Sequence, residues 1–390
     1  MDIAINMIKS LQDSGCSDIE IKTKVIETLS PFFIHSNNLE EHWNNAQLLS
    51  AFAFISRYKG DDDFSNSINE FLGIYRSAVS QTPEKVIQII LDSHDVFSAN
   101  ENQMWAIKKD ITNLGTGDLD ERIAGYMGYI GTTLEVSVKA IVCEIWFMIQ
   151  LSEGKNFENG LPKLNFGSAI HNILNKKVFT NLLVTYPLSA KLSDWRNIAY
   201  HHTYQIDDSE QIKCIYGNGA SSFSLTEQEL LHHLHNIVRA SNILNIARCL
   251  FAFDYIDEIG RIKRCRKDNP VRFNRSMLAN NLKTSMLSQG FQLREFHEQS
   301  DSIICDITDL RNNGTLSDAD IAIRLSSCTS YLFQVWYMYK KSHIQIDYYI
   351  SGNQIPSHSI RCSENDFILQ GKDIVEFADE DNSITLIFDD

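Results

Sequence analysis

The chain is poor in proline, and its cysteines are not arranged in pairs or in metal-binding sets. Its 390 residues include only six prolines, which excludes long proline-rich linkers and favours a mostly helical protein. The eight cysteines are scattered, and none belongs to a Cys-x-x-Cys pair or to a cysteine–histidine set with zinc spacing. The sequence therefore predicts free cysteines in a reducing compartment.

Long uncharged apolar runs are also missing. The first residues, Met1-Asp2-Ile3-Ala4, lack the basic start and apolar stretch of a secretory signal peptide. The most apolar stretch, residues 134–151, is interrupted by Glu135, Lys139 and Glu144, which argues against a membrane-spanning helix. With 43% hydrophobic residues the chain can still bury a core, so we expect a globular, cytoplasmic protein with no membrane partner.

Positive charge is scarce overall, because 35 Lys and Arg face 50 Asp and Glu, for a formal net charge of −15. One basic stretch, residues 261–275, departs from this balance and contains seven cations. Within it, Arg264, Arg266 and Lys267 are candidate RNA-binding residues, since Lys and Arg supply sequence-independent affinity for phosphates. A solvated basic loop, or a contact with an acidic part of the same chain, is the alternative interpretation.

The most informative segment runs from Asp194 to His201 and reads Asp-Trp-Arg-Asn-Ile-Ala-Tyr-His. On a helix, Arg196 and His201 would lie a little more than one turn apart and project from one edge. An arginine can hold a phosphate with its planar fork of donors, and a histidine can transfer a proton near neutral pH. Asn197 offers a donor and an acceptor that could orient either group. These groups suffice to cleave RNA without a metal.

This segment resembles the signature of HEPN-superfamily ribonucleases, which is an arginine, a polar residue, a few further residues and a histidine. The surrounding order fits the family's helical bundle, because a long helix precedes the segment, and a turn-rich patch at 216–219 and another long helix follow it. The similarity covers roughly residues 118–255. It implies an endoribonuclease whose catalytic residues are Arg196, Asn197 and His201, joined in some members by a glutamate of the earlier helix, here Glu135.

The resemblance also implies the products and the partners. Attack by the ribose 2′-hydroxyl would leave a 2′,3′-cyclic phosphate and a 5′-hydroxyl, with no cofactor and no metal. Because one histidine cannot easily serve as both acid and base, HEPN ribonucleases pair two motifs across a dimer, so we expect a homodimer with a composite site. Many members are bacterial toxins or antiphage effectors of abortive infection, which adds RNA and an inhibitory partner protein or antitoxin as expected partners.

Other interpretations of these residues stay open. Arg196 and His201 could be ordinary helix-surface residues that cap the helix or bridge to Asp194. Glu135 either pairs with Arg196 in a partly buried site or is a surface acid near a helix N-terminus. For the whole protein, the alternative function is a catalytically inactive HEPN-fold protein used for dimerisation, nucleotide sensing or regulation.

Several further histidines and acids are assigned to ordinary positions. His202 would point about 100° away from His201 on a helix, so we expect it to face solvent or to pack. His232, His233 and His235 have poor spacing for one metal ion, and we expect them at the surface or at a pocket rim. The acidic run at 61–63 is interpreted as the N-terminal cap of a helix.

The expected fold class is mainly α, a HEPN-like bundle with an N-terminal helical region and a small C-terminal antiparallel β segment. A capping box of Ser224 and Glu227 is expected to start the long helix after the motif. Residues 307–312 echo residues 192–197, so 280–342 is either a second HEPN-like half that lacks its histidine or a coincidence. The expected division is 1–115 N-terminal helical, 118–255 HEPN-like catalytic, 256–342 helical and 343–390 β-rich.

Overall fold

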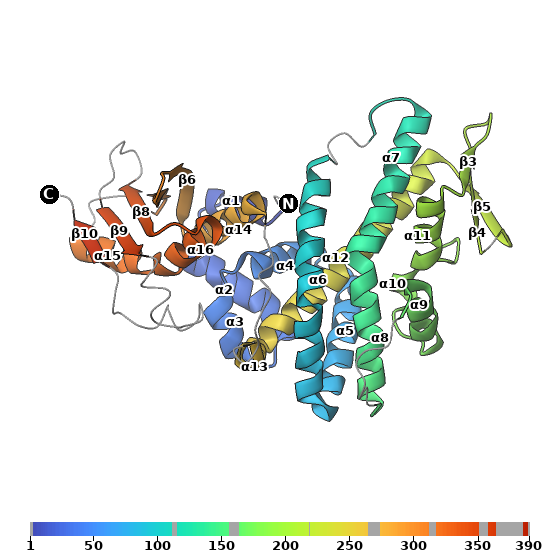
Figure 1. The fold of residues 1–390 in the computed structure, drawn as a ribbon, viewed down its shortest axis with the longest axis horizontal. Helices are drawn as coiled ribbons and strands as arrows, with labels where there is room; N and C mark the ends of the chain where they lie inside the picture. Colours follow the sequence, from blue (N-terminus) through green and yellow to red (C-terminus); the bar gives the residue numbers. More distant parts are fainter. Residues whose placement is uncertain are drawn as a thin grey trace. The chain divides into compact units, whose positions relative to one another are not determined.

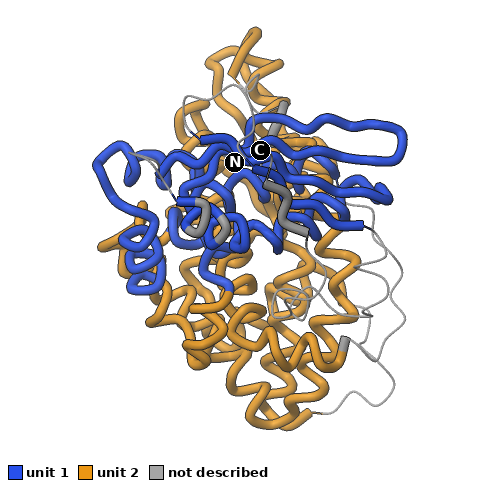
Figure 2. Tube along the Cα trace, turned by 90° about the vertical axis from the view of Figure 1, so that its left-hand side faces the viewer, with its two compact units in different colours: residues 1–28, 42–54, 273–390 blue, residues 29–41, 55–272 orange. Residues whose placement is uncertain are grey.

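The computed structural model describes residues 3–110, 115–155, 164–217, 219–263, 274–311, 317–350, 358–363 and 385–388. The fold is mainly helical with a sheet toward the C-terminus, as expected from the sequence (Figure 1). The chain forms two compact units (Figure 2). Unit 1 comprises residues 1–28, 42–54 and 273–390, and unit 2 comprises 29–41 and 55–272. The units thus divide the N-terminal helices between them, instead of setting residues 1–115 apart.

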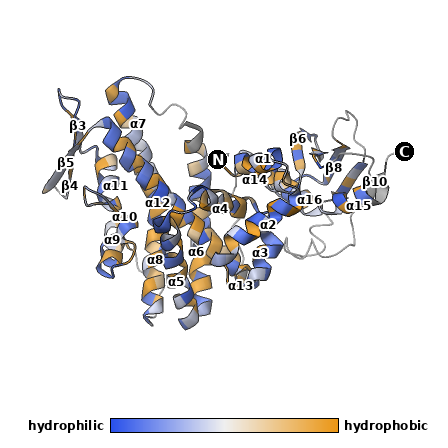
Figure 3. Cartoon of the chain, turned by 180° about the vertical axis from the view of Figure 1, so that it is seen from behind, coloured by the Kyte–Doolittle hydropathy of each residue, from blue (hydrophilic) through white to orange (hydrophobic). Residues whose placement is uncertain are grey.

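Unit 2 is built around long helices that pack side by side. They are α5 (Asp62–Gln81), α6 (Pro83–Asp110), α7 (Leu119–Thr132), the π-helical segment η3 (Thr133–Val138), α8 (Lys139–Ser152) and α12 (Glu227–Asp254). The segments α7, η3 and α8 follow one another without a break, so they form one long helical rod with a π-helical middle. Apolar residues mark much of α8, which packs inside the bundle (Figure 3).

The shorter elements of unit 2 lie between α8 and α12 in the chain. The helices are α9 (Phe166–Asn175), α10 (Thr180–Leu183) and α11 (Leu192–His201). The strands β1 (Val184–Thr185) and β2 (Ala190–Lys191) pair, and β3 (Tyr204–Ile206), β4 (Ile212–Tyr216) and β5 (Ser221–Leu225) form an antiparallel sheet. The turn-rich patch at 216–219 therefore connects two paired strands, as its composition predicts. The unit also contains η1 (Ser30–Phe32) and α13 (Ile256–Lys263).

A buried polar network joins the long helices of unit 2. Glu144 of α8 has a side chain only 3% exposed, yet both of its oxygens are hydrogen-bonded. Tyr75 Oη donates to Oε1 at 2.7 Å, Ser93 Oγ donates to Oε2 at 2.7 Å, and Arg248 Nε donates to Oε1 at 3.1 Å. Since these donors come from α5, α6 and α12, one carboxylate fixes four helices relative to one another.

Of the two helix N-termini predicted in unit 2, one is confirmed and one is wrong. Asp61 caps α5 by accepting the Phe64 N–H at 3.0 Å, so the interpretation of the acidic run is confirmed. The capping box expected at Ser224 is wrong, because Ser224 lies in β5 opposite Lys213. Strand pairing keeps the backbone extended up to Leu225, and α12 starts instead after Thr226, which forms the capping box with Glu229.

Unit 1 contains a mixed sheet of five described strands in the order β10-β9-β8-β7-β6. The strands are β6 (Phe291–Glu298), β7 (Ser302–Asp309), β8 (His343–Ile350), β9 (His358–Ser363) and β10 (Thr385–Phe388). The pair β7–β8 is parallel and the other pairs are antiparallel. The helices of unit 1 are α1 (Ile3–Asp13), most of α2 (Asp18–Leu29) and of α4 (Ala46–Arg57), α14 (Arg275–Ser288), α15 (Asp318–Ser326) and α16 (Thr329–Tyr339). The short helix α3 (Ser36–His42) belongs to unit 2 except for its last residue.

This sheet corrects the expected division of the chain and decides between the two interpretations of the echo at 307–312. Within the β-rich segment expected from residue 343, strands β8, β9 and β10 are present. The sequence of this segment also predicts short strands at 367–370 and 374–377, which lie outside the described residues. The sheet begins earlier, however, at Phe291, so the region 256–342 is not purely helical. Residues 307–309 end strand β7, whereas 192–194 begin helix α11, so the echo is not a second copy of the helical motif. Burial of Ile303, Cys305 and Ile307 at a period of two explains the strand.

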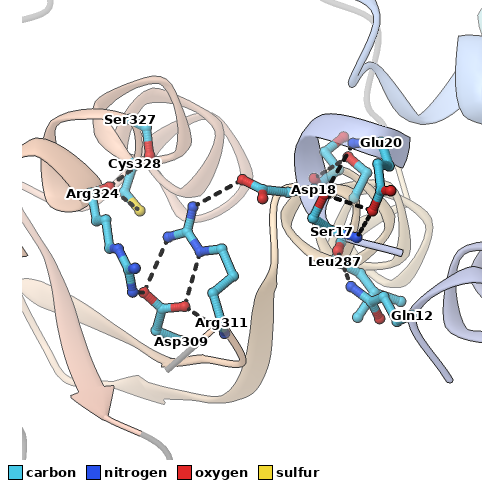
Figure 4. Close-up of polar contacts among 12 residues, drawn as sticks. Gln12, Ser17, Asp18, Glu20, Leu287, Asp309, Arg311, Arg324, Ser327 and Cys328 are labelled. Carbon is cyan, nitrogen blue, oxygen red and sulfur yellow. Dashed lines mark hydrogen bonds and ion pairs between the residues drawn. The ribbon is translucent and has the colours of Figure 1, made fainter. Parts of the chain in front are cut away.

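The last residue of β7, Asp309, is buried and accepts several hydrogen bonds (Figure 4). Asp309 Oδ1 accepts the backbone N–H and the Nε of Arg311, and Oδ2 accepts Arg311 Nη2, Arg324 Nη1 and Tyr348 Oη, the last at 2.7 Å. Burial raises the pKa of this carboxyl, but the donors, Arg311 first, outweigh it and hold the pKa below its ordinary value. Arg311 also lies over the Phe291 ring at 4.2 Å and reaches Asp18 Oδ2 at 3.5 Å.

Gly290 makes room for this arginine. Its φ is +80°, and a Cβ added there would lie 2.5 Å from Arg311 Cγ and Cδ. We expect Gly290→Ala to destabilise unit 1 by more than the about 1–2 kcal/mol that a left-handed conformation costs an L-residue. Gly15→Ala is the matched control, because Gly15 has a φ of +87° with nothing within 4 Å of its added Cβ. Denaturant unfolding of the two variants measures the difference, and equal destabilisation would contradict the proposed clash.

Candidate functional site

Helix α11 carries the motif and packs against the α7–η3–α8 rod. At Gly131 the two helices approach so closely that an added Cβ would lie 3.1 Å from the Ala199 Cβ. Just after this contact the rod becomes π-helical over Thr133–Val138, and Glu135 lies in that segment. Short π-helical insertions widen the helix locally and often occur at functional sites.

The buried Trp195 fixes the orientation of α11. Its indole Nε1 donates to Thr185 Oγ1 at 2.8 Å, and its ring lies 5.3 Å from the rings of Phe223 and His233. The preceding Asp194 accepts the backbone N–H of Lys191 at 2.9 Å and so caps the helix. Trp195 therefore anchors one face of α11 inside the unit, while Arg196, the next residue, points to a different side.

Arg196 pairs with Glu135 across the two helices. Its Nε donates to Glu135 Oε2 at 3.0 Å, its Nη1 donates to Asn197 Oδ1 at 3.2 Å, and its guanidinium lies 4.7 Å from the Tyr200 ring centre. The Nζ of Lys139 donates to the other oxygen, Glu135 Oε1, at 2.5 Å. The sequence left open whether Glu135 pairs with Arg196 or is a surface acid near a helix N-terminus. In the structure, Glu135 pairs with Arg196.

The charges of this cluster do not cancel. Partial burial raises the pKa of the Glu135 carboxyl, but the hydrogen bonds and charges of Lys139 and Arg196 outweigh it and lower the pKa overall. Glu135 is thus anionic at neutral pH and neutralises one of its two cations, which leaves a net charge of about +1. Two of the five N–H donors of Arg196 are used in these bonds, so three remain for an anion.

A cavity of about 560 Å³ opens beside this cluster. Its lining residues are Lys139, Leu164, Asn165, Phe166, Gly167, Ser193, Arg196 and Asn197. Two features make the cavity suitable for an anion in addition to the cations. The N-terminus of α9 opens onto it, with Asn165 as the cap, and helix N-termini present unpaired N–H groups. Ser193, which is only 7% exposed, lines the same cavity and carries a hydroxyl that can donate a hydrogen bond.

The histidine of the motif lies apart from this lining. His201 is the last residue of α11, it is exposed, and it does not line the cavity. His202 is also exposed and caps the helix with a φ of +51°, so it turns away from the helical path, in keeping with a solvent-facing position. The structure thus joins Arg196, Asn197 and Glu135 at one place, and puts His201 at the accessible end of the same helix.

Of the three histidines predicted to lie at the surface or at a pocket rim, two are exposed and one is buried. His232 and His235 of α12 are exposed, as expected. His233 is not at the surface, because it is 3% exposed and packs against Trp195. Burial, with a smaller contribution from His232, lowers the pKa of His233. The position of Trp195, a contact distant in the sequence, accounts for this correction.

The cavity residues Lys139, Asn165 and Ser193 were missed, although Lys139 follows Glu135 by four residues, a spacing that favours an ion pair on a helix. The basic candidates Arg264, Arg266 and Lys267 lie outside the described residues.

Comparison with known proteins adds no relative. A scan against protein-family models gave no match, and searches of curated proteins and of solved structures gave none at the significance required. None of the helices in the described part of the chain is both long and apolar enough to cross a bilayer. The resemblance to HEPN ribonucleases therefore rests on the residues of this chain alone.

Proposed function

We propose that the protein is a metal-independent endoribonuclease of the HEPN type. The observation that carries the proposal is the placement of Arg196, whose Nε is bonded to Glu135 and which lines a cavity together with Lys139 and Asn197. An arginine held in this way is oriented before substrate arrives, so less free energy is lost on binding a phosphate. The proposed partners are RNA, a second copy of the chain and an inhibitory protein or antitoxin, in a cytoplasmic toxin or antiphage effector.

The proposed chemistry assigns a step to each group. The cavity receives the scissile phosphate, where Arg196, Lys139 and the N-terminus of α9 offset the charge that develops on the phosphorane. A histidine removes the proton of the ribose 2′-hydroxyl, whose oxygen attacks phosphorus. A second histidine protonates the leaving 5′-oxygen, which yields the 2′,3′-cyclic phosphate and the 5′-hydroxyl.

The two histidines come from two protomers in this proposal. His201 is exposed at the end of α11, so a second α11 placed across a two-fold axis would bring both copies to one phosphate. Because Asn197 precedes His201 by four residues, the two side chains lie on one side of the helix, where Asn197 could orient the imidazole.

One observation favours the alternative of a catalytically inactive HEPN-fold protein that dimerises, senses a nucleotide or regulates. His201 does not line the cavity, and Arg196 already has three partners, namely Glu135, Asn197 and the Tyr200 ring. Such a protein would bind a nucleotide phosphate without cleaving RNA. Incubation with total RNA in EDTA separates the two functions, since only the ribonuclease shortens the RNA.

Neighbouring histidines offer a matched test of catalysis. We expect His201→Asn to lower the cleavage rate by about 10²–10⁴-fold, which is the usual cost of losing a positioned acid or base. His202→Asn is the control, because it makes the same exchange one residue away and asparagine tolerates the left-handed conformation of that position. The rate of appearance of 2′,3′-cyclic ends is measured for both. Wild-type cleavage by His201→Asn would refute the assignment.

A mixing experiment tests the composite site. If each dimer needs both copies of His201, an equimolar mixture of wild-type and His201→Asn chains that exchange subunits should keep about a quarter of the activity of the same total amount of wild-type protein. Mixing with His202→Asn chains should leave the activity unchanged. Retention of half of the activity would mean that each protomer acts independently.

The basic stretch is proposed as the surface that attracts RNA. Changing Arg264, Arg266 and Lys267 together to Gln should weaken RNA binding and flatten its salt dependence by up to about three phosphate contacts. The cleavage rate at saturating RNA should change little. An unchanged affinity and salt slope would exclude the stretch as an RNA contact.

A further inference from the structure

Unit 1 presents a polar surface on the face of its sheet opposite the apolar core. On β7 the core residues Ile303, Cys305 and Ile307 alternate with Ile304, Asp306 and Thr308, which face the other side. On β8, Ile346 and Tyr348 belong to the core, so Asp347 lies on the same polar face. The register pairs Asp306 directly with Asp347.

Three potential metal ligands meet on this face. Glu295 and His297 of β6 and Asp306 of β7 place one ligand atom each within 4.8 Å of one another. His297 Nε2 lies 2.8 Å from Asp306 Oδ2 and 3.6 Å from Glu295 Oε1. Ligand atoms about 2.0–2.2 Å from a tetrahedral ion are about 3.3–3.6 Å apart, so these spacings need only small adjustments of two exposed side chains to hold one ion.

One oxygen of the Asp306 carboxylate has no hydrogen-bond partner among the described residues. Its side chain is only 8% exposed, and Oδ1 is buried with no hydrogen-bond partner. Within the described residues, Oδ2 has two hydrogen-bond partners, His297 Nε2 at 2.8 Å and Tyr349 Oη at 3.3 Å. An oxygen of a buried carboxylate that accepts no hydrogen bond is costly unless a cation is close.

The neighbouring Asp347 increases this cost. Like charges directly opposite each other on adjacent strands are destabilising. Across the described parts of the chain, no Lys or Arg forms an ion pair with Asp306 or Asp347. Arg294 donates instead to Thr308 Oγ1, and Arg361 donates to Gln345 Oε1. Among the described residues, His297 is the one side chain able to carry positive charge that pairs with Asp306, and it is also close to Glu295.

We propose that this cluster binds a divalent transition-metal ion, with His297, Glu295 and Asp306 as ligands and Asp347 as a neighbouring charge. The imidazole among the ligands favours zinc over magnesium and calcium, which prefer all-oxygen sites, and the two carboxylates also suit manganese. Three protein ligands leave a coordination position for water or for a bound molecule. This site is separate from the proposed ribonuclease site, and its existence does not depend on that function.

Metal titration of the full chain tests the site. We expect chelator-treated protein to bind one equivalent of Zn²⁺ in calorimetry, and to compete with buffer for Mn²⁺ in electron paramagnetic resonance. Asp306→Asn and His297→Gln should each weaken binding by about 10-fold or more, because each removes a direct ligand. His297 is exposed, so its variant is expected to fold even if the variant of the buried aspartate does not.

A second aspartate–histidine pair on the same sheet supplies the control. Asp301 Oδ2 lies 3.3 Å from His343 Nδ1, and both side chains are exposed. Asp301→Asn should leave metal binding unchanged. The proposal is overturned if the wild-type chain binds neither metal at about 100 μM, or if Asp301→Asn weakens binding as much as His297→Gln. RNA cleavage in EDTA is measured separately, so failure of either proposal can be told from failure of the other.

Discussion

The buried carboxylate of Glu144 is the constraint on which the geometry of unit 2 depends. Donors from α5, α6 and α12 converge on this one residue of α8. Breaking such a buried pair by removing one partner typically costs about 3–5 kcal/mol, because the remaining charge is left uncompensated. The network therefore selects one arrangement of the bundle among the many that apolar packing alone would permit. Since α8 continues η3 without a break, the same network fixes the position of Glu135.

The candidate site is built on that rod by a second, more exposed set of charges. Glu135 lies where the rod becomes π-helical, and it orients Arg196 from α11 while Lys139 occupies its other oxygen. One anion and two cations leave positive charge beside a cavity onto which the N-terminus of α9 opens. Both features favour an anionic ligand, because the helix terminus and the spare cation act in the same direction. Burial of Trp195 keeps α11 in place without using any group that faces the cavity.

Two aspartates on strand β7 illustrate how the surroundings of a carboxylate separate a structural role from a binding role. Asp309 is buried, and the donors of Arg311, Arg324 and Tyr348 satisfy both of its oxygens. Asp306 lies three residues earlier and so faces the opposite side of the sheet, where one of its oxygens has no partner. The Asp309 carboxylate thus has all of its hydrogen-bond donors within the protein. The Asp306 carboxylate lies next to Asp347 and has no Arg or Lys partner among the described residues, only His297, which is why a metal ion is inferred there and not at Asp309.

The sequence by itself determined the local features of this protein. The helical class, the Asp61 cap and the strands after residue 343 follow from periodicity and capping, which depend on residues close in the chain. The motif also predicted which side chains could bind phosphate. Tertiary structure decided the pairing of Glu135 with Arg196, the cavity with Lys139 and Ser193, and the burial of His233. It also decided that residues 307–309 form a strand although they echo the start of α11, because pairing with β6 and β8 outweighs local preference. Such contacts join residues far apart in the chain, so no short pattern records them.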